Sequence, residues 1–209
     1  MTAQDVINLA KNAELKQLAV RTDDSAVLGF INLGLLELYK RFPLKEAEAI
    51  ITLRDGKTTY KLDGTDPDVS IDSDKELLII TGAYTTSDDG FVEEMTMNDE
   101  DDIMGINTPS YNTVEIPATA EGVLVSIIYR ATPKFITSVD DLLPLPPQLL
   151  EALLNYVGYR GHGSVSGELN AENQSHYVRF ENSCKRVILE GLITSDDLVS
   201  KKFKNRGFV

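Results

Sequence analysis

Apolar residues recur at two different periods along the chain, and the change of period divides it into segments. In residues 1–46 and 135–194 they recur every three or four positions, which is typical of one face of a helix. In residues 47–134 they alternate with polar residues or form short runs bounded by Gly and Pro. The pattern predicts an α+β protein in which N- and C-terminal helices form a helical bundle, with a β-rich insertion between them.

Two helices are predicted in residues 1–46. The first runs from Thr2 to about Lys16, and its apolar face comprises Val6, Leu9, Ala10 and Ala13. The second begins after the N-cap oxygens of residues 23–25, and its apolar residues alternate at spacings of three and four: Leu28, Ile31, Leu35, Leu38 and Phe42. Such a stripe requires a partner helix, and Gly34 beside it would permit close approach of the two backbones.

The insertion, residues 47–134, is predicted to contain several short strands. Residues 50–53 and 58–62 flank an Asp-Gly pair, which is typical of a β-hairpin turn. Further strands are expected at residues 77–84, 91–95, 113–116 and 123–129. Prolines at positions 109, 117 and 133 are expected to mark strand ends.

Two more helices are predicted in residues 135–194. Pro147 suits the first turn of a helix, because its missing N–H has no helical partner there. Four glycines between residues 158 and 167 predict a loose connection to a long helix that runs from about Asn170 to Glu190. Gly191 would cap that helix, whose apolar stripe comprises Tyr177, Phe180, Cys184, Val187 and Ile188. Residues 195–209 then form a basic C-terminal tail.

The negative charge of the chain is confined to one segment. The 209 residues carry a formal net charge of −13, which argues against a protein that grips nucleic acid broadly through its phosphates. Residues 63–102 contain fourteen acidic residues and one basic residue, Lys75, so this segment holds the whole excess. The acids either lie in solvated turns around strands, or form a negative surface that repels DNA or binds a basic partner.

The residue patterns do not indicate an enzyme, a cofactor or a metal site. His162 and His176 match no zinc spacing, and the acids at 66–68 and 99–102 do not follow the EF-hand pattern. Residues 160–167 are rich in Gly but lack the Gly-Lys-Ser/Thr end of a phosphate-binding loop, so a flexible linker explains them better. The single cysteine, Cys184, lies on an apolar stripe and is expected to be a buried thiol in a reducing cytoplasm. The apolar runs are too short for a membrane span.

The order of several local segments resembles the head-to-tail adaptor (connector) proteins of tailed bacteriophages. These segments are FINLGLLELYKRF at 30–42, NDEDD at 98–102 with TPSYNT at 108–113, IYRATP at 128–133, and LPP at 145–147 with YVRFE at 177–181. The resemblance implies a structural virion protein at the head-tail junction, present in the host cytoplasm during assembly. It also implies a homo-oligomeric ring, typically a dodecamer, that docks under the portal protein and joins the capsid to a tail or nozzle protein. DNA would pass through the ring without sequence-specific binding, and the family offers no catalytic residue to transfer.

Two charged segments have candidate roles in such a ring. The acidic segment would either line the channel and keep DNA from adhering, or face the tail and bind a basic partner, which we favour. The residues concerned are Asp88, Asp89, Glu93, Glu94, Asp99, Glu100, Asp101 and Asp102. The basic tail is either a frayed terminus or a docking arm for the portal, formed by Lys201, Lys202, Phe203, Lys204, Arg206 and Phe208. The alternative function is a soluble acidic module that binds a divalent ion or a basic protein.

Overall fold

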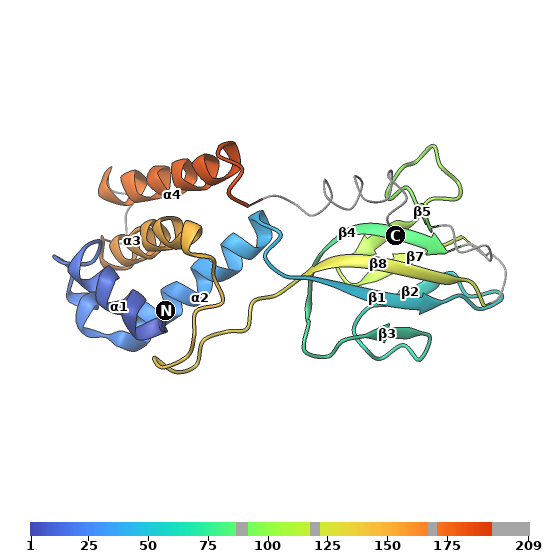
Figure 1. The fold of residues 1–209 in the computed structure, drawn as a ribbon, viewed down its shortest axis with the longest axis horizontal. Helices are drawn as coiled ribbons and strands as arrows, with labels where there is room; N and C mark the ends of the chain where they lie inside the picture. The colour runs from blue at the N-terminus through green and yellow to red at the C-terminus, as the bar shows by residue number, and fades with distance from the viewer. Residues whose placement is uncertain (87–91, 118–121, 167–170, 194–209) are drawn as a thin grey trace. The chain divides into compact units, whose positions relative to one another are not determined.

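The computed structural model describes residues 1–86, 92–117, 122–166 and 171–193 (Figure 1). Over these residues the fold is α+β, with four α-helices and two antiparallel sheets. The chain divides into two compact units. The helical unit comprises Met1–Pro43 and Pro133–Val209, and the β unit comprises Leu44–Thr132.

The helical unit contains α1 (Ala3–Asn12), α2 (Asp24–Arg41), α3 (Leu150–Ser166) and α4 (Ala171–Leu189), with short 3₁₀ turns at Ala19–Thr22 and Pro147–Leu149. Local signals set the helix starts. Thr2 and Asp5 form a capping box at α1, and the Asp23 carboxylate accepts a hydrogen bond of 3.1 Å from the Ala26 N–H at α2, as predicted. Pro147 lies in the 3₁₀ turn that leads directly into α3.

Helix α3 contacts α1, α2 and α4. Ile31, Leu35 and Leu38 of the predicted α2 stripe are fully buried. A Cβ placed on Gly34 would lie only 2.6 Å from Leu153 Cδ1, so a side chain of α3 packs directly against the backbone of α2 at this glycine. The prediction for the first helix was wrong in extent, and its apolar face is confirmed only for Val6 and Ala10. Helix α1 ends at Asn12 rather than near residue 16, and its buried residues are Ala3, Val6, Ile7 and Ala10, whereas Leu9 and Ala13 are exposed.

The glycine-rich stretch after residue 158 is helical, so the predicted loose connection is wrong over residues 158–166. Helix α3 continues to Ser166, and two of its glycines lie where side chains of other segments approach its backbone. A Cβ on Gly161 would collide with Leu15, and one on Gly158 would lie 2.8 Å from His176 Nδ1. At the end of α4 the predicted glycine cap is confirmed. Gly191 has a φ of +62°, and the Leu192 N–H donates to the Val187 carbonyl over 3.1 Å.

The β unit contains two sheets. The five-stranded sheet has the order β3-β1-β8-β4-β5, and the three-stranded sheet has the order β2-β7-β6. Both sheets bury side chains in one hydrophobic cluster, to which Ile51 and Ile127 belong from the first sheet and Tyr60 and Val114 from the second. The strands are β1 (Glu46–Thr52), β2 (Thr59–Lys61), β3 (Val69–Ile71), β4 (Leu77–Thr86), β5 (Val92–Glu94), β6 (Asn107–Ser110), β7 (Thr113–Glu115) and β8 (Leu124–Ala131).

The predicted hairpin around the Asp-Gly pair is wrong. The turn itself forms, with Gly56 at a φ of +72°, but the strands on either side of it belong to different sheets. Both edges of β1 are already paired, because Ile51 lies opposite Val69 on one side and Val125 on the other. Strand β2 therefore pairs with β7 instead. Strands β3 and β6 were missed, and Pro109 lies inside β6, where an outer strand tolerates the missing N–H.

Candidate docking surfaces

Residues 98–105, here called the acidic turn, project between Met97 and Ile106 of the β unit. Asn98 starts the turn in the left-handed conformation, with a φ of +54°. Its side-chain oxygen accepts the Thr108 N–H and its amide group donates to the Thr108 hydroxyl, each over 2.8 Å. Backbone bonds of 2.8 Å from the Ile106 N–H to Thr96 and from the Asn98 N–H to Ile106 close the base of the turn. The turn is thus fixed to the strands that flank it.

The acids of this turn have different roles. Asp102 accepts hydrogen bonds from the Thr96 hydroxyl and, over 2.9 Å, from the Met104 N–H. These two bonds, the hydroxyl first, lower the pKa of the Asp102 carboxyl. Asp102 therefore stabilises the turn internally. Asp99, Glu100 and Asp101 are exposed, although the Asp99 carboxylate also accepts the Asp101 N–H over 3.0 Å.

Two apolar side chains are displayed on the same turn. Ile103 is 87% exposed and Met104 is 60% exposed, directly after the run of acids. Sequence analysis missed this pair, although an Ile-Met step directly after an acidic run is the available signal. Two neighbouring apolar side chains on a braced turn, beside exposed carboxylates, make this turn a candidate surface for contact with another protein.

Two of the other acids predicted for this surface lie on β5. Glu93 and Glu94 are exposed on β5, opposite Thr85 and Tyr84 of β4, and this strand leads into the acidic turn. Asp88 and Asp89 lie outside the described residues. The tail residues Lys201, Lys202, Phe203, Lys204, Arg206 and Phe208 lie outside them as well.

Two further acids of the charged segment are internal and paired. Lys57 Nζ lies 2.6 Å from the Asp66 carboxylate and 2.8 Å from that of Asp68, which also pairs with Arg54 over 2.5 Å. Burial opposes ionisation of Asp66, but hydrogen bonds from Lys57 and from backbone N–H groups outweigh it and lower the pKa of this carboxyl. The unpaired negative charge of the segment therefore lies away from residues 66–68.

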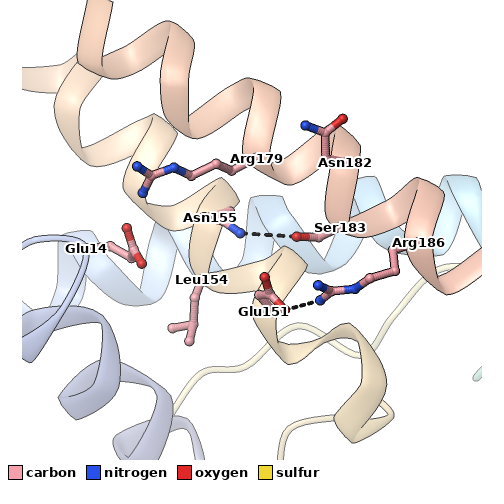
Figure 2. A pocket seen from close by; sticks show the side chains of 8 residues that line it. All are labelled: Glu14, Glu151, Leu154, Asn155, Arg179, Asn182, Ser183 and Arg186. Carbon is pink, nitrogen blue, oxygen red and sulfur yellow. Dashed lines mark hydrogen bonds and ion pairs between the residues drawn. The ribbon is translucent and has the colours of Figure 1, made fainter.

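The helical unit has a polar pocket of about 430 Å³ (Figure 2). Asn155 Nδ2 donates to Ser183 Oγ over 3.3 Å at its floor, and Arg186 pairs with Glu151 at its rim. Figure 2 shows all of the lining residues: Glu14, Glu151, Leu154, Asn155, Arg179, Asn182, Ser183 and Arg186. Acidic and basic side chains are balanced in number, so the pocket favours neither an anion nor a cation.

The β unit has a groove of about 390 Å³ between β4 and β6. Its lining residues are Leu78, Ile79, Ile80, Thr108, Ser110 and Tyr111. One wall is aliphatic and the other carries hydroxyl groups. Thr108 also holds Asn98, so the groove adjoins the acidic turn.

A comparison with family models gives the decisive observation. The model described as SU10 adaptor protein matches residues 1–197. The chain belongs to this family. The match confirms the resemblance to phage head-to-tail adaptors that was drawn from the order of short segments. No curated protein matches the chain.

Both histidines and the single cysteine of this adaptor-family chain lie in packed surroundings. His162 and His176 stack with ring centroids 4.7 Å apart, and His176 Nδ1 lies 3.2 Å from the Glu14 carboxylate. Burial raises the pKa of the Cys184 thiol to about 11, so this cysteine is un-ionised at neutral pH. Within the described residues, no three His, Cys, Asp or Glu side chains gather as a metal site, and no helix could span a membrane.

Proposed function

We propose that the chain is a structural virion protein without catalytic activity, located at the head-tail junction. Identical copies form a ring that docks under the portal protein, joins the capsid to a tail or nozzle protein, and leaves a channel for DNA. Membership of the adaptor family over residues 1–197 carries this proposal. Residues 1–46 and 135–194 form the bundle that builds the ring, residues 47–134 face partners, and residues 195–209 reach the portal.

Exposed apolar side chains of the helical unit support ring formation. Leu9 on α1, Leu33 on α2 and Leu189 on α4 are exposed, as is Leu142 before α3. A closed ring joins two different faces of each subunit, so each copy needs apolar side chains on more than one element. We assign these residues to contacts between neighbouring copies. The copy number of twelve follows from the resemblance.

The acidic turn is the proposed docking surface for the tail side. Asp99, Glu100 and Asp101 would meet basic side chains of the partner, and Ile103 with Met104 would enter an apolar pocket. Glu93 and Glu94 extend the same negative surface, to which the sequence also assigns Asp88 and Asp89. This charge also disfavours adhesion of DNA, so the genome passes without sequence-specific binding.

Electron microscopy of mixtures with the portal protein tests the ring. The chain and the portal protein of the same phage are mixed and imaged in negative stain. We expect an added ring beneath the portal, and a chain that stays monomeric and unbound would contradict the proposal. Deletion of residues 201–209 is expected to abolish portal binding and to leave the fold intact.

Charge reversal tests the acidic turn separately. The triple variant Asp99→Lys, Glu100→Lys, Asp101→Lys should still add a ring to the portal but should no longer bind the tail protein. The matched control reverses three exposed acids elsewhere in the β unit, namely Glu48, Asp55 and Glu115. Equal loss of tail binding in both variants would show that only total charge matters.

A further inference from the structure

The groove between β4 and β6 opens at an incomplete edge of the five-stranded sheet. Strand β5 pairs with β4 only over Tyr84–Thr86, and Met95 adds one backbone bond to Ala83. In the described part of the chain no strand pairs with that edge of β4 over residues 78–82. The chain instead leaves at Asn98 into the acidic turn and returns as β6, which forms the opposite wall of the groove.

The lining of the groove suits an extended peptide. Ile80 packs against the hydrophobic cluster of the β unit and also lines the groove, so an inserted apolar side chain would extend the core. Ile79 is exposed along the groove, and Tyr111 is 75% exposed. Unpaired backbone groups of β4 would hydrogen-bond to a strand placed there, as in other complexes in which a peptide is added to a sheet edge.

The charge beside the groove selects the kind of peptide. The acidic turn adjoins it through the bonds between Asn98 and Thr108. Asp99, Glu100 and Asp101 are exposed and form no ion pair with any described residue. A cationic segment would be attracted to this rim, and an anionic one would be repelled.

We propose that the groove binds an extended segment of a partner protein in which apolar residues alternate with Lys or Arg. The segment adds a strand along residues 78–82 of β4, places its apolar side chains against Ile80 and Tyr111, and carries its cations on the opposite face, with Ile79, toward the acidic turn. The inference deepens the docking function proposed above and rests on it for the identity of the partner.

Peptide binding to the full-length chain tests the groove. The probe is a capped peptide of about eight residues that alternates Val and Lys, and its counterpart alternates Val and Glu. We expect the Lys peptide to bind at least about tenfold more tightly than the Glu peptide at low salt. Backbone amide resonances of residues 78–82 and 107–111 should shift on binding.

Three variants localise the binding. Ile79→Lys and Tyr111→Ala should each weaken the Lys peptide by at least about tenfold. Leu124→Lys, on neighbouring β8 and also exposed, is the matched control and should bind normally. Equal binding of the two peptides, shifts confined to the acidic turn, or full affinity in both groove variants would overturn the inference.

The failure of this inference is distinguishable from failure of the proposed function. If the chain forms a ring on the portal and binds the tail protein but does not bind the Lys peptide, only the groove inference is wrong. If the peptide binds but no ring forms, the inference about the groove is supported and the proposed adaptor function is wrong. Binding of a second copy of the chain in the groove, seen as intermolecular contacts to residues 78–82, would also overturn it.

Discussion

The contact between α2 and α3 at Gly34 allows a test in which one glycine is the control for another. Ala is favoured over Gly in a helix by about 1 kcal/mol. At Gly29, on the same helix, an added Cβ meets nothing within 4 Å, so Gly29→Ala should stabilise the helical unit by about that amount. At Gly34 the Cβ would lie 2.6 Å from Leu153 Cδ1 and 3.1 Å from Tyr156 Cδ1.

The penalty at Gly34 follows from this crowding. Leu153 is fully buried, so its side chain cannot retreat into solvent. Overpacking of this kind costs about 1–3 kcal/mol, which offsets or exceeds the gain in helix propensity. Since propensity contributes equally to both variants, Gly29→Ala should exceed Gly34→Ala in free energy of unfolding by about 1–3 kcal/mol.

Urea denaturation followed by far-UV circular dichroism measures this difference, because the chain has no Trp for fluorescence. In a Leu153→Ala background the closer of the two obstructing side chains is gone and only Tyr156 remains, so the difference in stability between the two glycine variants should narrow. Equal stabilities of Gly29→Ala and Gly34→Ala in the native background would refute the close helix contact.

Three further predictions concern buried or paired groups. Asp68→Ala should lower the free energy of unfolding by about 1.5–3 kcal/mol, because two charge-assisted bonds are lost, whereas exposed Glu100→Ala should change it by less than about 0.5 kcal/mol in the same urea titration. The Cys184 thiol should react with a disulfide reagent only on unfolding. A thiol that reacts in the folded chain at the rate of the unfolded chain would contradict its burial. Burial also raises the pKa of this thiol to about 11, so the free energy of unfolding should fall as the pH rises above about 8.5, the pKa of the thiol in the unfolded chain. The Arg41 guanidinium lowers the pKa of Glu181, so Glu181→Gln should be less stable than the native chain above about pH 4.3. The difference in stability should disappear as the pH falls through the lowered pKa, and a difference that does not depend on pH would argue against the ion pair.

Signals that act over a few residues could be predicted from the sequence. Asp23 caps α2 through an N–H three residues away, and Gly191 ends α4 through bonds within one turn. The order of short segments also identified the family, which the match over residues 1–197 confirms. In each case the feature depends on residues that are close together in the sequence or on the order of segments along the chain.

The wrong predictions concern features that depend on contacts between segments far apart in the sequence. Gly161 lies within helix α3, where Leu15 packs directly against it, and no nearby residue reveals that contact. Strand β2 leaves β1 because β3 and β8 occupy both edges of β1. Ion pairs with Arg54 and Lys57 likewise remove Asp66 and Asp68 from the negative surface, and the groove between β4 and β6 exists only once both sheets have formed.

Assembly of phage particles tests the adaptor function most directly. In cells infected with the encoding phage from which this gene has been deleted, electron microscopy should show heads and tails that remain separate. Purified chain added to that extract should restore joined, infectious particles, and the charge-reversed triple variant at Asp99, Glu100 and Asp101 should not. Joined particles in the absence of the chain would contradict the account.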